Sequence, residues 1–310
     1  MSTQPRIAIG PSSAPVPPVI SEAVAAGGAA VVSIDERPEA LVWLDSADVE
    51  GLKGALGAAP SVHWIQLPFA GVENVATTGL FSEERTWTSA KGTYGPSCAE
   101  HALTLALAGL RFLPERITAR SWGDQAAGTL LGADVTILGG GGIASDLVRM
   151  LTPFETRITV VRRQDTPLRG AARTVPVARL DEALGGALVV FVALALTPDT
   201  RGIIAAPQFD AMDNQAWLIN VARGPHVVTD DLVAALRSGA IAGAGLDVTD
   251  PEPLPDGHPL WDLDNCIITP HTANPLASAI PLLAGRVRRN VAHLVAGEPF
   301  EGLVDVDAGY

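Results

Sequence analysis

Three side chains in the last third of the chain, Arg223, Glu252 and His271, are of types that cooperate in acid–base chemistry. A guanidinium can bind a carboxylate through two parallel hydrogen bonds. An imidazole can give a proton to the alkoxide that forms when a carbonyl is reduced, and a carboxylate can keep that imidazole charged. Together they supply what reduction of a 2-oxo acid needs. Taken singly, each is more simply explained as a loop or turn residue.

A glycine cluster, ILGGGGIASDLV, joins an apolar run to a helical pattern. Gly139, Gly141 and Ala144 fit the G-x-G-x-x-A spacing, which serves a tight turn, close backbone approach to a pyrophosphate, and helix–strand packing. The backbone N–H groups of Gly142 and Ile143 would then point at the phosphates. The alternative is an ordinary glycine-rich turn between a strand and a helix.

Two arginines stand in TVVRRQD, residues 159–165, where a dinucleotide-binding unit carries the residue that selects the ribose. Arg162 lies 23 residues after Gly139, the spacing at which an acidic residue holds the ribose hydroxyls of NAD. An arginine cannot accept those hydrogen bonds, but Arg162 and Arg163 can pair with a 2′-phosphate. The pair predicts NADP as the cofactor, with NAD as the alternative. A solvated strand end is the competing interpretation.

Short apolar runs bounded by Gly, Pro or Asp alternate with Ala- and Leu-rich helical patterns along the whole chain. This alternation predicts parallel sheets covered on both faces, in two α/β units. A helix is expected from about Ser21, and another over residues 98–122 as a connector between the units. The predicted strands are RIAIG, VVSI, ALVWL and VHWIQL in the first unit, and VTIL, ITVV, LVVFVAL, AWLINVA, AGAGLDV and NCIIT in the second.

The order of several motifs resembles the family of D-isomer-specific 2-hydroxyacid dehydrogenases. The family's N-x-x-R-G, L-D-V, E-P, H-P-L-W and T-P-H segments are matched in order. The matching residues are Asn220, Arg223, Gly224, Leu246 to Val248, Glu252, Pro253, His258 to Trp261 and Thr269 to His271. Further similar segments are AGVENV at 70–75, SCAEHALTLALAGLR at 97–111, LTPDTRG at 196–202 and the closing VDVDAGY at 304–310.

The resemblance implies two doubly wound parallel-sheet domains, with a Rossmann dinucleotide-binding domain inserted into a flavodoxin-like substrate domain. On this basis we expect residues 1–97 and 275–310 to form the substrate domain and residues 98–274 to bind the dinucleotide. The active site is expected in the cleft between the domains.

The resemblance also implies a role for each candidate catalytic residue. Arg223 would bind the carboxylate and carbonyl of the substrate. His271 would be the acid in reduction and the base in oxidation, with Glu252 hydrogen-bonded to its other nitrogen. The loop Ala70, Gly71 and Val72 would hold the substrate carboxylate through backbone N–H groups. His101 and Trp122 also match family positions, and we expect both to be packing residues.

The cofactor residues that the resemblance implies come from five segments of the second unit. Asp247 would face the nicotinamide, or alternatively cap a turn. Ala195 stands where many family members have proline, beside the nicotinamide ribose. The full set is Gly139, Gly141, Gly142, Ile143, Arg162, Arg163, Leu194, Ala195, Thr200, Val221, Ala222 and Asp247.

The function that follows is hydride transfer between NADP(H) and a small 2-oxo or D-2-hydroxy acid, with glyoxylate or hydroxypyruvate reduction as the expected reaction. A formate-type dehydrogenase is a rival, but that branch lacks a carboxylate beside its histidine. A dinucleotide-sensing, corepressor-like binding protein on the same fold is the alternative outside the enzymes.

Charge and composition restrict the partners. The formal net charge of −13 argues against nucleic acid. The longest apolar stretch, LGGALVVFVALAL, is too short to cross a bilayer. Cys98 and Cys266 allow at most one disulfide and show no metal-ligand spacing, so we expect no metal site and a cytoplasmic location. A homodimer is expected, through the Ala- and Leu-rich face around residues 102–110.

Overall fold

The computed structural model describes residues 4–164 and 166–306. Asp165 of the TVVRRQD segment and the last four residues of VDVDAGY therefore lie outside the described residues. The chain forms two compact units, one of Met1–Tyr94 with Pro275–Tyr310 and one of Gly95–Asn274. The first division falls a few residues before the expected boundary at 97, because Gly95 already begins a helix of the second unit. The roles assigned to the two units stay predictions.

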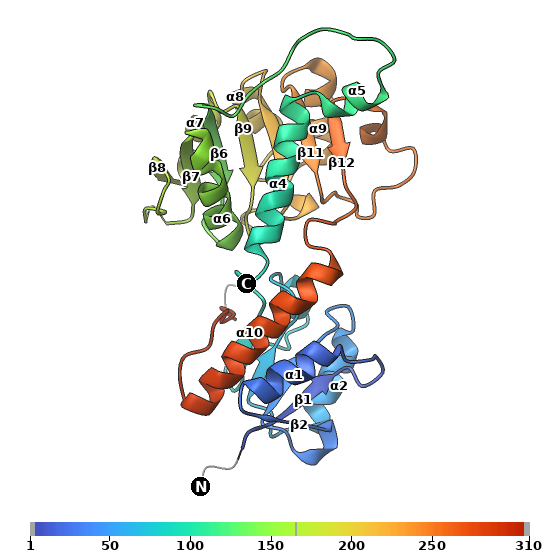
Figure 1. The fold of residues 1–310 in the computed structure, drawn as a ribbon, viewed down its shortest axis with the longest axis vertical. Helices are drawn as coiled ribbons and strands as arrows, with labels where there is room; N and C mark the ends of the chain where they lie inside the picture. The colour runs from blue at the N-terminus through green and yellow to red at the C-terminus, as the bar shows by residue number, and fades with distance from the viewer. Residues whose placement is uncertain (1–3, 165, 307–310) are drawn as a thin grey trace. The chain divides into compact units, whose positions relative to one another are not determined.

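The first unit, here the five-stranded unit, has one parallel sheet in the order β2-β1-β3-β4-β5 (Figure 1). This is the flavodoxin-like strand order. Its strands are β1 (Arg6–Gly10), β2 (Ala30–Val32), β3 (Ala40–Trp43), β4 (Trp64–Gln66) and β5 (Thr86–Thr88). Its helices are α1 (Pro18–Ala26), the 3₁₀ turn η1 (Ile34–Glu36), α2 (Val49–Ala58), α3 (Glu73–Ala76) and α10 (Leu276–Ala296), and α1 packs against α10.

The second unit, here the seven-stranded unit, has a parallel sheet in the order β12-β11-β10-β9-β6-β7-β8. Six of these strands follow the Rossmann order, and β12 extends it at one edge. The strands are β6 (Asp134–Leu138), β7 (Arg157–Arg162), β8 (Arg173–Pro176), β9 (Val189–Val192), β10 (Trp217–Asn220), β11 (Gly243–Leu246) and β12 (Cys266–Ile268). The helices are α4 (Gly95–Leu110), α5 (Leu113–Thr118), α6 (Gly142–Leu151), α7 (Leu180–Leu184), α8 (Ala206–Ala211) and α9 (Thr229–Ser238), with 3₁₀ turns η2 (Thr152–Phe154), η3 (Val177–Arg179), η4 (Gly224–His226) and η5 (Pro259–Asp262).

The central strands of this sheet show why uniformly apolar runs are needed. On β9, Val189 and Phe191 belong to the core beneath α4 and α6, whereas Val190 and Val192 belong to the core on the opposite face. Successive side chains of a strand point to opposite faces, so a strand covered on both faces is apolar at every position. The two-unit α/β fold expected from the sequence is confirmed.

The long connector helix expected over residues 98–122 is broken in the structure. Phe112 has a φ of 53°, in the left-handed region, and separates α4 from the short α5. No helix continues beyond Thr118 as far as residue 122. Part of the apolar face of α4 is core, because Ala102, Leu105 and Ala106 are 0 to 3% exposed, whereas Leu103 and Leu107 are only partly buried. The predicted location of the dimer interface around residues 102–110 stays a prediction.

Candidate active site

The predicted site residues of the seven-stranded unit follow the carboxyl ends of its parallel strands. The glycine turn follows β6, Arg162 ends β7, and Leu194 and Ala195 follow β9. The Val221–Arg223 segment follows β10, Asp247 follows β11, and His271 follows β12. Ligands of open α/β sheets bind outside this edge, at the point where the strand order reverses. The reversal in this sheet lies between β6 and β9, beside the glycine turn.

The glycine turn has the geometry of a pyrophosphate cradle. Gly139 has a φ of +117°, and a Cβ there would collide with the carbonyl oxygen of Ala193, so this position requires glycine. A Cβ at Gly141 would meet nothing within 4 Å, which leaves the backbone open to a ligand. The helix α6 begins at Gly142, whose N–H and that of Ile143 lie in its first turn. These residues fit the diphosphate of a dinucleotide.

Arg162 lies directly beside this turn. A Cβ on Gly140 would be 2.8 Å from Nε of Arg162 and 2.9 Å from its Cζ, so the guanidinium lies against Gly140. Its Nη1 also lies 3.5 Å from the carbonyl oxygen of Thr166. Arg163 follows on the exposed side of the strand end. The structure thus places one of the two arginines against the predicted phosphate cradle.

The N-x-x-R-G segment is a loop that Asn220 holds in shape. The buried Asn220 side chain accepts a hydrogen bond from the N–H of Ala222 (3.0 Å) and donates one to the carbonyl of Arg223 (2.9 Å). A Cβ on Gly224 would collide with the carbonyl of Thr249, so glycine is required after the arginine. The motif therefore encodes a rigid support for Arg223.

His271 and Glu252 form a direct pair. Nδ1 of His271 lies 2.6 Å from Oε1 of Glu252, and the two side chains are 51% and 39% exposed. Fixing Nδ1 in this way leaves Nε2 as the nitrogen that can exchange a proton with a ligand. His271 has a φ of 52°, a conformation that non-glycine residues rarely adopt.

Asp247 is buried and holds the loop that carries His271. Its Oδ1 accepts hydrogen bonds from Oγ1 of Thr269 (2.6 Å) and N–H of Thr272 (2.8 Å), and its Oδ2 accepts one from N–H of Ala273 (2.9 Å). Nε2 of His101 lies 3.3 Å from Oδ1. Burial by itself raises the pKa of Asp247, but the hydrogen bonds outweigh burial and hold this pKa below its ordinary value. The carboxylate is thus charged and fully engaged by the loop.

The remaining predicted cofactor residues lie in loops that pack against one another. Oγ1 of Thr200 donates to the carbonyl of Ala195 (2.8 Å) and accepts from N–H of Thr197 (2.8 Å), which closes the loop after β9. Buried His226 connects this loop to the next one, with Nε2 3.3 Å from the Ala195 carbonyl and Nδ1 3.0 Å from the Arg223 carbonyl. Leu194 is half-buried against the core, and Val221 and Ala222 are buried.

The predicted substrate loop belongs to the five-stranded unit. Ala70 is exposed, Gly71 is half-buried, and Val72 is buried immediately before α3. The structure therefore assigns these three residues and the Arg223–Glu252–His271 set to different units. A direct role of Ala70, Gly71 and Val72 in substrate binding stays a prediction.

Both cysteines are free thiols among the described residues. Burial raises the pKa of Cys98 to about 11, with a further increase from the charge of Asp247 and an opposing effect of Arg223. Burial raises the pKa of Cys266 to about 12. Neither thiol is ionised near neutral pH, so neither is a nucleophile there.

Several supporting residues could not be assigned from the sequence. His226 carries no motif signal, and the contacts of His101 with Thr269 (2.9 Å) and Asp247 join residues that are far apart in the sequence. His101 therefore supports the site instead of only filling space. Trp122 was expected to pack, yet it is 87% exposed, so that prediction is wrong for the single chain.

The model of the D-isomer-specific 2-hydroxyacid dehydrogenase NAD-binding domain matches residues 102–273, more than half of the chain. The chain belongs to this family. As a D-2-hydroxyacid dehydrogenase, it is an oxidoreductase that uses a nicotinamide dinucleotide, and it carries the expected Arg–Glu–His set at the strand edge where the family model lies.

Relatives by sequence include a glyoxylate reductase of Thermofilum pendens, 30% identical over 273 residues, with 84% of this chain and 79% of that protein covered. An uncharacterised protein of Corynebacterium melassecola is 38% identical over 256 residues, with 81% and 84% covered. A glyoxylate reductase/hydroxypyruvate reductase of Mus musculus is 41% identical over 192 residues, with 58% of each chain covered.

Solved structures of similar proteins agree over nearly the whole chain. A D-isomer-specific 2-hydroxyacid dehydrogenase from Xanthobacter autotrophicus, in complex with NADPH and MES, has a TM-score of 0.85 at 26% identity, covering 99% of this chain and 100% of that one. An NADPH-dependent glyoxylate/hydroxypyruvate reductase from Sinorhizobium meliloti, in complex with NADP and sulfate, has a TM-score of 0.81 at 27% identity with the same coverage.

Metal centres and membrane-spanning helices are absent from the part of the chain that the structure describes. No group of three or more His, Cys, Asp and Glu side chains there could hold a metal ion. Within the same residues, every helix is too short or too polar to cross a bilayer.

Proposed function

We propose that this dehydrogenase reduces a small 2-oxo acid, with glyoxylate and hydroxypyruvate as the first candidates and NADPH as the preferred cofactor. The observation that carries the proposal is the 2.6 Å pair of His271 and Glu252 on the strand edge that also holds Arg223. The names of relatives in mouse, Thermofilum and Sinorhizobium support the choice of substrates. A corepressor-like role without catalysis is not favoured by these relatives.

The proton step rests on His271. When bound, the reduced nicotinamide would supply a hydride to the carbonyl carbon of the substrate. Nε2 of His271 would donate a proton to the carbonyl oxygen as negative charge develops there. Glu252, hydrogen-bonded at Nδ1, would stabilise the imidazolium before the transfer and hold the ring in one orientation. In the oxidation direction the same nitrogen would take the proton back.

Substrate orientation is the proposed task of Arg223. A guanidinium can bind a carboxylate oxygen and the neighbouring carbonyl oxygen at once, which places the reacting carbon in a fixed position. Asn220 and Gly224 keep the loop of this arginine rigid, so the loop loses less conformational entropy when the substrate binds. The backbone N–H groups of Ala70, Gly71 and Val72 are the proposed second contact to the substrate carboxylate.

The preference for NADPH is proposed from the position of Arg162 over the glycine turn. The guanidinium of Arg162 offers a positive charge there, which suits a 2′-phosphate better than two ribose hydroxyls. Leu194, Ala195, Val221 and Ala222 are proposed to form the wall around the nicotinamide end, with Thr200 holding the loop of Ala195. For Asp247 we propose that its hydrogen bonds hold the loop of His271 beside the nicotinamide.

A homodimer is the proposed assembly, and the segment that follows residues 102–110 is proposed to contribute to its interface. Four large apolar side chains between residues 113 and 131 are strongly exposed in the single chain. They are Leu113 (44%), Ile117 (76%), Trp122 (87%) and Leu131 (63%). Exposed apolar side chains gathered in one segment mark an interaction site more often than scattered ones do. A cytoplasmic location is proposed from the two free thiols.

The test is an initial-rate assay of NADPH and NADH oxidation with a panel of 2-oxo acids. We expect turnover of glyoxylate and hydroxypyruvate with NADPH, and a D product where a stereocentre forms. If neither cofactor is oxidised with any of the 2-oxo acids, the proposed function is wrong.

A further inference from the structure

Arg286 is a charged side chain buried in the five-stranded unit, and the proposed chemistry gives it no task. It lies on α10 and is 5% exposed. Its Nη1 donates a hydrogen bond to the carbonyl of Ser89 (2.8 Å), and its Nη2 donates one to the carbonyl of Lys91 (2.9 Å). Oε2 of Glu301 lies 3.1 Å from Nε of Arg286, as an ion pair without the geometry of a hydrogen bond. Burying a guanidinium is unfavourable unless its partners are held in place, so Arg286 and the segment 89–91 restrain each other.

The two carbonyls that Arg286 holds lie on either side of Ala90. Ala90 is fully buried, and its N–H donates a hydrogen bond to the carbonyl of Phe69 at 3.0 Å. The carbonyl of Ser89 and the N–H of Ala90 belong to one peptide group, which is planar and trans, so they point in opposite directions. Fixing the carbonyl of Ser89 on Arg286 therefore directs the N–H of Ala90 toward Phe69.

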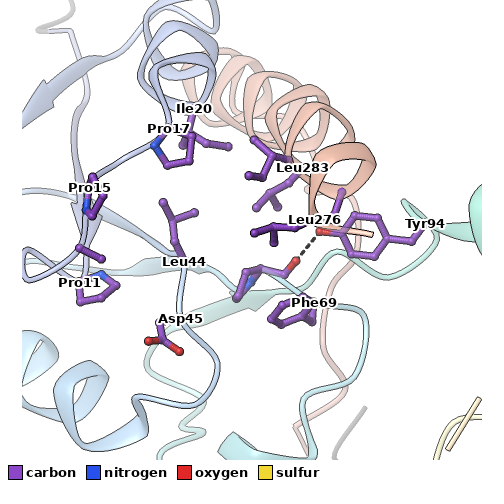
Figure 2. Close-up of a pocket in the computed structure, with 14 residues that line it drawn as sticks. Pro11, Pro15, Pro17, Ile20, Leu44, Asp45, Phe69, Tyr94, Leu276 and Leu283 are labelled. Atoms are coloured by element: carbon purple, nitrogen blue, oxygen red, sulfur yellow. Dashed lines mark hydrogen bonds between the residues drawn. The ribbon is translucent and has the colours of Figure 1, made fainter. Parts of the chain in front are cut away.

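The same relation applies to the next peptide group in this series of contacts. The carbonyl of Phe69 and the N–H of Ala70 share a peptide group, so holding that carbonyl on Ala90 directs the N–H of Ala70 the opposite way. The carbonyl of Pro68 is held as well, because it accepts a hydrogen bond from the hydroxyl of Tyr94 at 2.5 Å, beside the apolar pocket in Figure 2. Two successive carbonyls before the loop of residues 70–72 are thus fixed from within the unit.

The N–H groups of that loop are left for another acceptor. Within residues 4–164 and 166–306, no atom accepts a hydrogen bond from the N–H of Ala70, Gly71 or Val72. A backbone N–H without a partner in the protein takes its acceptor from water or from a ligand. Successive backbone N–H groups of this kind suit an anion, and these three are the groups proposed above to bind the substrate carboxylate.

We infer that Arg286 is a positioning residue for substrate binding, because it orients the N–H of Ala70 through two peptide groups, one joining residues 89 and 90 and one joining residues 69 and 70. The inference rests on the proposed function, in which this loop holds the substrate carboxylate. A hydrogen bond to a charged acceptor changes affinity by about 10- to 10²-fold. The carboxylate is charged before and during hydride transfer, so misplacing this N–H should change KM and not kcat.

Removing the guanidinium tests the assignment. Arg286→Met keeps an extended side chain but removes every N–H donor. At saturating NADPH, KM for glyoxylate, or for the best 2-oxo acid of the panel, should rise by about 10- to 10²-fold, with kcat within about 3-fold of the wild type. The dissociation constant for NADPH should not change, because the glycine turn belongs to the other unit. Arg289→Met is the matched control, since Arg289 lies on the same helix and holds the same Glu301 (3.0 Å) but is 45% exposed, and it should keep the wild-type KM.

A second variant and a second measurement cover the case in which Arg286→Met does not fold. Arg286→Lys keeps the buried charge beside Glu301, but an ammonium lacks the planar fork that holds two carbonyls at once, so KM should again rise by at least about 10-fold. Hydrogen exchange of the Ala90 amide, measured by NMR, follows its hydrogen bond without catalysis. It should be at least about 10-fold faster in either Arg286 variant than in the wild type or Arg289→Met.

The outcomes separate this inference from the proposed function. A wild-type KM, or wild-type exchange of the Ala90 amide, in a folded Arg286 variant would overturn the inference, while reduction of a 2-oxo acid by the wild type would still uphold the proposed function. An equal rise of KM in Arg289→Met would also overturn it. Failure of the wild type to reduce any 2-oxo acid would overturn both.

Discussion

The carboxylate of Glu252 contacts His271 at Nδ1, 2.6 Å away, although both side chains are substantially exposed. An exposed ion pair contributes little to stability, typically about 0 to 1 kcal/mol. His271 also has a left-handed backbone, with φ of 52°, which for a residue other than glycine costs on the order of 1 kcal/mol. A contact that adds little stability, on a residue with a strained backbone, supports the proposed role of the ring in catalysis.

Loss of the imidazole is the first prediction. His271→Ala should lower kcat for reduction by at least about 10²-fold, because no other group replaces the proton donor. Binding of NADPH, followed by its fluorescence, should persist, since the glycine turn is untouched. His63→Ala is the control, because His63 is exposed in the other unit and should retain full activity. Equal losses in the two variants would contradict the assignment.

Loss of the carboxylate beside the imidazole is the second prediction. Glu252→Gln keeps the size of the side chain but replaces the carboxylate that holds Nδ1 of the ring by an amide. The value of kcat for reduction should fall by at least about 10-fold, while binding of NADPH persists. A variant with the kcat of the wild type would exclude Glu252 from the proton step.

The third prediction concerns Asp247. Burial raises its pKa, but the hydrogen bonds from His101 and from the loop of residues 269–273 outweigh burial and hold the pKa in the folded protein below its ordinary value. A pKa lower in the folded than in the unfolded chain stabilises the fold above the unfolded value, about 3.9 for aspartate, and this contribution is lost as pH falls through the folded value. Asp247→Asn should therefore lower the free energy of unfolding at pH 7, by about 2 kcal/mol.

Thermal unfolding of wild type and Asp247→Asn across pH tests this. The difference in Tm should be largest at neutral pH and should shrink below about pH 4, as the carboxylate takes up a proton first in the unfolded chain and, at lower pH, in the folded chain. Asp230→Asn, an exposed position in the first turn of α9, is the control. A difference in Tm that does not change with pH would mean that the charge of Asp247 is not what holds the loop.

Most of the fold could be predicted from the sequence because buried parallel strands are apolar at every position, as in VVFV of β9. The strands β5 and β8 were missed. TWT of β5 is three residues long, and RTVP of β8 mixes charged and polar residues with proline at the edge of the sheet, so neither produces a continuous apolar run. The break at Phe112 was missed because its left-handed conformation has no signal in the residue type.

Candidate site residues can be proposed from the sequence where chemistry restricts the residue type, as at Gly139, Arg223 and His271, and their roles stay predictions. The site was not predictable where any of several residues could do the same task. Both oxygens of Asp247 are used by a loop that begins 22 residues later, and no spacing rule relates the two segments. His226 likewise connects two loops through hydrogen-bond contacts with backbone carbonyls. Every residue has a backbone carbonyl, so no residue type in the sequence marks these partners. Contacts of this kind depend on the folded arrangement of the loops.

The fourth prediction concerns the exposed apolar segment after α4. If it is the interface of a homodimer, light scattering at micromolar concentration should give twice the chain mass, and Trp122→Ser should lower that mass or raise the dissociation constant at least about 10-fold, because aromatic anchors dominate interfaces. Leu303→Ser is the control, since Leu303 is 51% exposed in the five-stranded unit. A wild-type protein with the mass of one chain would contradict the dimer.

The last prediction returns to the arginines that end β7. Arg162 lies over the glycine turn, with no carboxylate at the position that selects the ribose, so a 2′-phosphate would gain one or two charge-assisted hydrogen bonds there. Each is worth roughly 1.5 to 3 kcal/mol, which corresponds to a preference for NADPH over NADH of about 10- to 10³-fold in kcat/KM. The preference should weaken as salt is raised, because both arginines are near the surface.

Substitution separates this explanation from a general effect of charge. Arg162→Asp should erase or reverse the preference, since the new carboxylate repels a phosphate and accepts hydrogen bonds from ribose hydroxyls, and Arg163→Ala should reduce it. Arg237→Asp changes the net charge equally at an exposed position on α9 and should leave the preference intact. Equal use of NADH and NADPH by the wild type would mean that the arginines are a solvated strand end.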